Sequence, residues 1–180
     1  MFADFEKFFN ISSQNGAFLE NPRKALINLY GGGVYGGGVF SVLSERDVET
    51  WRKTITDFYQ DFRNRITPFA FDWLGRCFAE DSMDKNHVLM FEIGTANVLI
   101  IPADILTFLN SEIPNNSEAC LALGAYHSWL SQRNPPVTYG QCVGYKIPLF
   151  LGGKDAFENM ELSSLDVYWN IMGQVMLQTR

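Results

Sequence analysis

The sequence has few of the residue types from which catalytic and metal sites are most often built. Only three cysteines and two histidines occur in 180 residues, and Cys77, Cys120 and Cys142 form no CxxC pair. An odd, widely spaced set favours buried free thiols over a disulfide framework or a zinc site. His87 and His127 have no HxH or HxxxH partner, so no metal or other cofactor is predicted. We expect both histidines to be structural, with His127 on the apolar stripe of a helix.

Long apolar runs and a signal peptide are also lacking. No stretch approaches the ~20 apolar residues that a membrane-spanning helix requires. The N-terminal segment MFADFEKFF carries Asp4 and Glu6 where a signal peptide would be basic. We therefore expect a soluble protein of the cytoplasm with no membrane partner.

Basic residues are scarce in one part of the chain. The formal net charge is −6, and seven acids but only one base, Lys85, lie between Glu80 and Glu118. The seven acids are Glu80, Asp81, Asp84, Glu92, Asp104, Glu112 and Glu118. Direct nucleic-acid binding is disfavoured, because phosphate contacts need clustered lysine and arginine. The acids form either a solvated face or a surface that binds a basic partner.

Periodicity predicts a helix at residues 44–62. Its apolar side chains recur at spacings of three and four, and they are Val48, Trp51, Ile55, Phe58 and Phe62. Ser44 followed by Asp47 resembles a capping box. Before this helix, residues 25–30 and 39–43 read as strands on either side of a glycine run, as in a hairpin.

The rest of the chain predicts an antiparallel meander followed by helices. Residues 68–80 turn at Gly75, and residues 87–101 contain two strand-like runs. Residues 105–108 and 118–130 read as helices and residues 140–151 as a strand with a turn after it. Residues 165–178 close the chain as a helix that is apolar on two faces. The fold class is therefore α+β, mainly antiparallel sheet flanked by helices in a single compact domain, with residues 1–62 and 63–180 as its two parts.

The glycine run at residues 31–38 satisfies the GxGxxG pattern at Gly31, Gly33 and Gly36. A dinucleotide-binding fingerprint must open a helix that holds the pyrophosphate, whereas this run continues into strand-like sequence. We therefore interpret it as a hairpin tip or a close-packed turn.

Catalytic alternatives find little local support. A small cysteine hydrolase would pair Cys77 or Cys142 with His127, but no local signature places them together. Asp81 and Asp84 have the spacing for acid/base chemistry, yet the surrounding AEDSMDKN reads as an exposed loop. The sequence predicts a binding protein rather than an enzyme.

Four motifs in the second part of the chain occur in a characteristic order. They are FDWLGRCFA at residues 71–79, FEIGT at 91–95, GYKIPLFLGG at 144–153 and NMELSSLDVYWNIMGQ at 159–174. Together they resemble the C-terminal domain family of bacterial type VI secretion immunity proteins of the Tdi type, over about residues 66–178. Residues 1–62 resemble loosely the GAD-like segment that precedes this domain in some members.

The resemblance implies an immunity protein that binds and neutralises a cognate DNase toxin in bacterial competition and performs no chemistry. It supplies no catalytic residues. Nuclease toxins present basic surfaces, so the candidate contact residues are Glu80, Asp81, Asp84, Glu112 and Glu118. A regulatory binding module related to the SMI1-type proteins is an alternative with a different partner.

Overall fold

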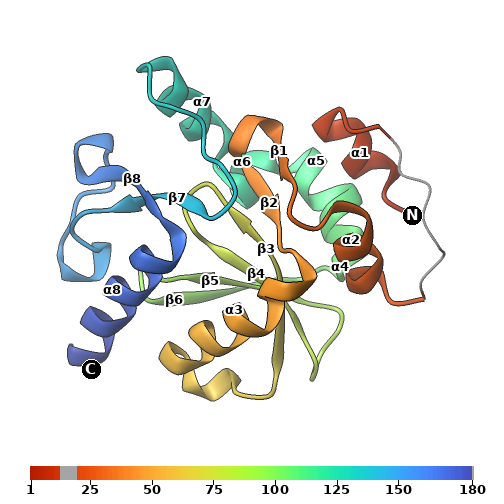
Figure 1. Ribbon diagram of the computed structural model, residues 1–180, viewed down its shortest axis with the longest axis horizontal. Helices are drawn as coiled ribbons and strands as arrows, with labels where there is room; N and C mark the ends of the chain where they lie inside the picture. The colour runs from red at the N-terminus through yellow and green to blue at the C-terminus, as the bar shows by residue number, and fades with distance from the viewer. Residues whose placement is uncertain (13–19, 180) are drawn as a thin grey trace.

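The centre of the molecule is a six-stranded antiparallel sheet in which the strands follow chain order (Figure 1). The computed structural model describes residues 1–12 and 20–179. The strands of this sheet are β1 (Val34–Tyr35), β2 (Phe40–Val42), β3 (Ile66–Asp72), β4 (Cys77–Asp81), β5 (Val88–Glu92) and β6 (Asn97–Ile101). A second sheet pairs β7 (Gln141–Tyr145) with β8 (Met160–Ser164). The predicted meander is confirmed.

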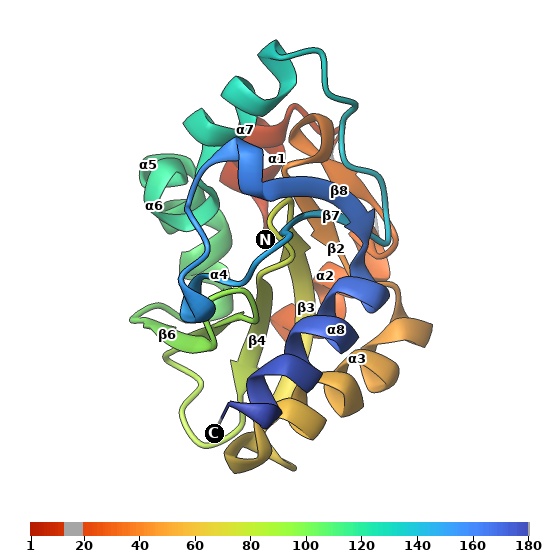
Figure 2. The same ribbon diagram turned by 90° about the vertical axis from the view of Figure 1, so that its left-hand side faces the viewer.

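Two layers of helices cover the sheet, one on each face (Figure 2). One layer consists of α3 (Glu45–Phe58) and α8 (Leu165–Gln178), which pack on Phe71, Leu89 and Phe91. The other layer lies over Phe78 and Met90 and holds the remaining helices. These are α1 (Ala3–Phe9), α2 (Pro22–Tyr30), α4 (Ile105–Thr107), α5 (Ile113–Asn115), α6 (Ser117–Leu121) and α7 (Leu123–Ser131). The predicted α+β class and single compact domain are confirmed.

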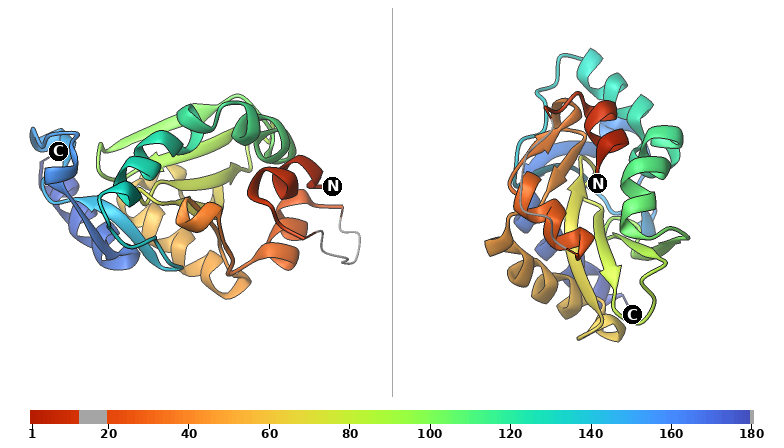
Figure 3. Two further views of the ribbon diagram at one scale, coloured as in Figure 1. Left: turned by 90° about the horizontal axis from the view of Figure 1, so that it is seen from above. Right: turned by 90° about the vertical axis from the view of Figure 1, so that its right-hand side faces the viewer.

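Short 3₁₀ and π-helical turns complete the chain between these elements. They are η1 (Gly36–Gly38), η2 (Gln60–Phe62), the π-helical turn η3 (Phe108–Glu112), η4 (Leu149–Leu151) and η5 (Phe157–Asn159). The N-terminus and the C-terminal helix α8 lie at opposite ends of the molecule (Figure 3). Because β2 pairs with β3, the main sheet continues across residue 62. The division of the chain at that residue stays a prediction.

The strand predicted at residues 25–30 is wrong, because these residues belong to α2. Asn21 caps that helix by accepting a hydrogen bond from the Lys24 backbone N–H at 2.9 Å, and Pro22 occupies its first position. Both are helix-start signals. The hairpin that does form is β1–η1–β2, with Gly36–Gly38 as its turn.

The single helix predicted at residues 118–130 is divided in two. Ala122 adopts a left-handed conformation at φ 48° and ψ 47°, which ends α6 and precedes α7. The buried side of α7 is formed by Tyr126 and Trp129, while His127 is exposed. The prediction that His127 lies on the apolar stripe is therefore wrong.

The C-terminal helix has the predicted bounds, but only one of its faces is buried. Trp169 and Met172 lie in the core, whereas Val167 and Ile171 are 48% and 53% exposed. The prediction of two packed faces is wrong.

At the start of α3, the Ser44 hydroxyl donates to the Asp47 carboxylate at 2.5 Å, so the capping box does not form in its usual arrangement.

None of the helices in the described ranges is long and apolar enough to cross a membrane.

Candidate partner-binding face

The helices from α4 to α7 carry acids without a single lysine or arginine. No basic residue other than histidine occurs between Lys85 and Arg133. Three acids of this segment belong to the helical layer, namely Asp104, Glu112 and Glu118. We call these three residues and the helices α4–α7 the acidic helical face. Its charge is not neutralised by neighbouring bases, because no salt bridge within residues 1–12 and 20–179 includes any of the three.

Each acid of this face also has a local structural contact. Asp104 caps α4 by accepting from the Thr107 backbone N–H at 2.7 Å. Glu112 accepts from the Asn116 side-chain amide at 2.9 Å. Glu118 accepts from the Gly124 backbone N–H at 2.7 Å, at the start of α7. Each carboxylate is therefore held in place while its charge remains unpaired.

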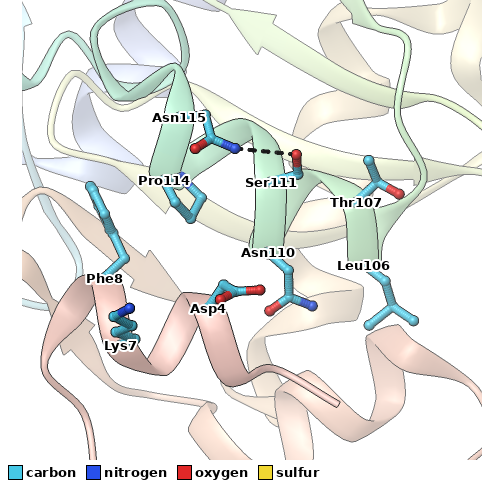
Figure 4. Close-up of a pocket in the computed structure, with 9 residues that line it drawn as sticks. All are labelled: Asp4, Lys7, Phe8, Leu106, Thr107, Asn110, Ser111, Pro114 and Asn115. Atoms are coloured by element: carbon cyan, nitrogen blue, oxygen red, sulfur yellow. Dashed lines mark hydrogen bonds between the residues drawn. The ribbon is translucent and has the colours of Figure 1, made fainter.

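A groove of about 820 Å³ adjoins this face, between α1 and the segment η3–α5. Figure 4 shows Asp4 and Lys7 of α1 on one side and Asn110, Ser111 and Asn115 on the other. The Asn110 side chain accepts from the Phe5 N–H at 3.3 Å and donates to the Met1 carbonyl at 2.9 Å. Asn110 therefore joins the N-terminal helix to the π-helical turn. The groove is lined by polar and apolar side chains, with Asp4 and Lys7 as its charged residues.

Three of the predicted contact residues lie elsewhere, at the end of β4 and in the loop after it. We call Glu80, Asp81 and Asp84 the β4-end cluster. Figures 1 and 2 place the end of β4 apart from α5 and α6. The structure therefore brings Glu112 and Glu118 to one layer and the β4-end cluster to a separate place.

The members of the β4-end cluster are largely paired within the protein. Glu80 accepts from Arg23 at 3.4 Å, and Asp84 lies 3.0 Å from His87. Asp81 is 2% exposed and accepts from Arg65 at 2.6 Å, which lowers the pKa of Asp81 below its usual value. The Coulomb field of His87 lowers it further. Of the three, Asp84 keeps the most exposed carboxylate.

A buried ionic cluster fixes the helical layer to the sheet. Asp72 accepts from Arg76 Nε at 2.5 Å, and Arg76 reaches Glu92 at 3.4 Å and the Cys120 carbonyl of α6 at 3.0 Å. Burial raises the pKa of Asp72 to about 6, against the lowering field of Arg76. The Trp73 indole N–H donates to the Leu121 carbonyl at 2.9 Å. The β3–β4 turn thus positions α6, and with it Glu118.

Sequence reasoning gave no role to Asp72 and Arg76. The signal that was available is their spacing: two opposite charges four residues apart on either side of Gly75, in an otherwise apolar stretch. Gly75 has a φ of 74°, which allows the tight turn that brings the two charges together.

The structure does not bring together the residues of the proposed cysteine hydrolase. Cys77 and Cys142 are fully buried, and burial raises the pKa of both thiols well above its usual value. His127 is exposed on α7. A nucleophilic thiolate needs a lowered pKa, and neither cysteine has one. All three cysteines are free and buried, as predicted.

The glycine run packs closely against α7. The Tyr126 hydroxyl donates to the Gly37 carbonyl at 2.6 Å and accepts from the Val137 N–H at 3.2 Å. A Cβ atom on Gly38 would lie 2.2 Å from that hydroxyl. The interpretation of this run as a close-packed turn is confirmed.

Within the described ranges, no three His, Cys, Asp or Glu side chains gather as metal ligands would.

Comparison with known proteins finds a family match in the last third of the chain. Residues 117–176 match the family model described as "T6SS immunity protein Tdi1, C-terminal", which confirms the resemblance over these residues. They contain α6, α7, the β7–β8 sheet and most of α8. The GAD-like resemblance of residues 1–62 stays a prediction. No curated protein matches the chain.

Solved structures share the fold. One of them is the crystal structure of Atu4351 from Agrobacterium tumefaciens, which is similar to this chain with a TM-score of 0.60 and 15% sequence identity. The similarity covers 97% of this chain and 89% of that one. At this identity the likeness shows the fold alone.

Proposed function

We propose that this chain, whose residues 117–176 match the C-terminal family of type VI secretion immunity proteins, binds and neutralises a cognate secreted nuclease toxin. The family match supports an immunity role in type VI secretion. The nuclease identity of the toxin, its DNase activity and the position of the complex in the cytoplasm are parts of the proposal. The protein performs no chemistry on the toxin.

The observation that carries the nuclease identity is the absence of lysine and arginine from the acidic helical face. A nuclease holds a polyphosphate with clustered basic residues. Asp104, Glu112 and Glu118 complement such a surface, and charges of opposite sign accelerate and orient association. Bound there, the immunity protein excludes the nucleic-acid substrate from the toxin.

The five proposed contact residues differ in how freely they can meet a partner. Among the described residues, no base lies within salt-bridge distance of Glu112 or Glu118, and these two acids form the main contact in this proposal. Asp84 contributes a second contact at the β4-end cluster. Glu80 and Asp81 do not bind the toxin directly in this proposal, because their carboxylates already pair with arginines of this chain.

The test is the affinity for the cognate toxin, which is sought among the products of the genes adjacent to this one and is called the neighbouring toxin. The double variant Glu112→Gln with Glu118→Gln removes two charges, and glutamine keeps an oxygen that accepts from Gly124. We expect binding about tenfold weaker, equivalent to about 1.4 kcal/mol, with most of the loss in the association rate. Calorimetric titration and stopped-flow mixing measure the two quantities.

A matched control removes two charges from the opposite layer. Glu45 and Asp57 are exposed on α3 and have no salt bridge within the described part of the chain. The double variant Glu45→Gln with Asp57→Gln should bind the toxin as the unaltered protein does. Equal losses of toxin affinity in the two double variants would mean that only the net charge of the protein matters. This result would contradict the proposed binding face.

The SMI1-like alternative shares the binding role but predicts a different partner. If the neighbouring toxin does not bind and a regulatory protein of the host does, the alternative replaces the proposal.

A further inference from the structure

The last strand of the main sheet has an open edge. Within residues 1–12 and 20–179, β6 pairs with β5 and no other strand, in five consecutive residue pairs without a register shift. In the described part of the chain, the only further hydrogen bond between backbone groups at this strand is from the Ala103 N–H to the Ile101 carbonyl. The Tyr59 hydroxyl also donates to the Asn97 carbonyl at 3.5 Å. Figure 2 shows β6 at the outer side of the sheet. Its free edge therefore offers main-chain donors and acceptors to another strand.

This edge lacks the features that normally prevent unwanted pairing. Proteins protect edge strands with charged side chains, proline, bulges or a covering element. The sequence of β6 is NVLII, without charge or proline, and its register is regular. The opposite edge strand, β1, has only two residues. β6 is thus the longer and less protected edge of the sheet.

The helical layers cover β6 only in part: Ile101 and Val98 are half-buried against the two cores, while Leu99 and Ile100 are exposed. Leu99 pairs with Met90, which faces the layer of α4–α7, and Ile100 pairs with Leu89, which faces α3 and α8. The two side chains are nevertheless 45% and 63% exposed. An added strand would lie beside apolar side chains on both faces of the sheet, which is the arrangement in which strand addition buries most apolar area.

We propose that an extended segment of the partner toxin adds to β6 as a seventh strand, with lysine or arginine flanking an apolar centre. The proposal rests on the proposed function. Asp104 follows β6 by three residues and begins the acidic helical face, so the edge and the unpaired charge are adjacent in the chain. A basic segment with an apolar centre complements both the strand edge and the unpaired acids. A second copy of this chain does not, because it would place its own acids, without lysine or arginine, beside these acids.

Hydrogen–deuterium exchange of the complex with the neighbouring toxin tests the pairing directly. Strand addition gives new hydrogen bonds to outward amides of residues 97–101, and we expect their exchange to slow at least about tenfold. A complex in which residues 97–101 exchange as in the free protein would overturn the strand pairing and leave the immunity role intact. A toxin that does not bind at all would overturn both.

Two substitutions give a second readout. Ile100→Lys places a charge on the exposed edge, where it blocks strand addition, and we expect the toxin to bind at least about tenfold more weakly. Ile171→Lys is the matched control, because Ile171 is similarly exposed on α8, and it should bind within about twofold of the unaltered protein. Equal binding by the two variants would overturn the proposal.

Light scattering distinguishes a toxin from a second copy. We expect the free protein to stay monomeric with and without Ile100→Lys. A dimer that Ile100→Lys dissociates would show that β6 pairs with itself, and it would overturn the assignment to the toxin.

Discussion

At the scale of single residues, Asp81 shows how an acid of the charged segment stabilises the fold. Its carboxylate accepts from Arg65 Nε at 2.9 Å and Nη2 at 2.6 Å, and from the Met83 backbone N–H at 2.9 Å. The Arg65 hydrogen bonds are the largest cause of its lowered pKa. The folded state therefore binds a proton at this carboxylate more weakly than the unfolded state does.

This difference predicts a specific loss of stability in acid. The contribution of Asp81 is fully present above its ordinary pKa of 3.8 and is lost as the pH falls through the lower pKa of the folded state. Asp81→Asn, which keeps one acceptor, should cost roughly 1–2 kcal/mol at neutral pH. Denaturant unfolding at pH 7 and below pH 3.8 measures it. The difference in the free energy of unfolding between the unaltered protein and Asp81→Asn should become smaller in acid. A difference independent of pH would contradict the stabilising role of the Asp81 carboxylate.

The pairing of the candidate contact residues was not predictable from the sequence. The count of seven acids against one base indicated a charged region, but Arg23 and Arg65 lie 57 and 16 positions from their partners. Only the fold brings them together. The sequence does show that no lysine or arginine lies near Glu112 and Glu118 in the chain, but only the fold shows that no base from elsewhere in the described residues pairs with them.

At the scale of elements, α3 and α8 cross where α8 has a glycine. Trp51 of α3 and Trp169 of α8 lie with ring centroids 6.0 Å apart. A Cβ atom on Gly173 would lie 2.5 Å from the Phe58 ring, which is buried. Contacts under 3.0 Å cannot be kept without displacing an atom, so Gly173 sets the distance between the two helices.

Gly173→Ala should therefore destabilise the protein although alanine is the better helix former. The intrinsic gain is about 1 kcal/mol, and overpacking costs typically 1–3 kcal/mol, so we expect a net loss of roughly 1 kcal/mol in the free energy of unfolding. Gln174→Ala, at the exposed neighbouring position, should be within about 0.5 kcal/mol of the unaltered protein. A stabilised Gly173→Ala variant would contradict the close crossing.

Periodic and turn-bounded elements were predictable from the sequence, and others were not. The 3–4 spacing of Val48 to Phe58 gave α3, and the apolar runs on either side of Gly75 gave β3 and β4. The run ALINLY at residues 25–30 is apolar nearly throughout, so its periodicity does not distinguish strand from helix. The break at Ala122 carries no glycine signal, because alanine rarely adopts a left-handed conformation.

At the scale of the whole molecule, the buried cluster of Asp72, Arg76 and Glu92 connects the sheet to α6 and so fixes the acidic helical face. The edge of β6 lies next to the start of this face in the chain. The two features give one continuous segment, residues 97–118, that is apolar at one end, acidic at the other and free of lysine and arginine. This arrangement is complementary to the basic toxin surface that we propose.

The salt dependence of toxin binding tests this account most directly. We expect the affinity of the unaltered protein to fall steadily as sodium chloride is raised from about 50 to about 500 mM, because salt screens exposed charges. The fall should be shallower for the Glu112→Gln with Glu118→Gln variant. A toxin affinity that does not change with salt, or the same slope for both proteins, would contradict the central claim that the acidic helical face binds a basic toxin.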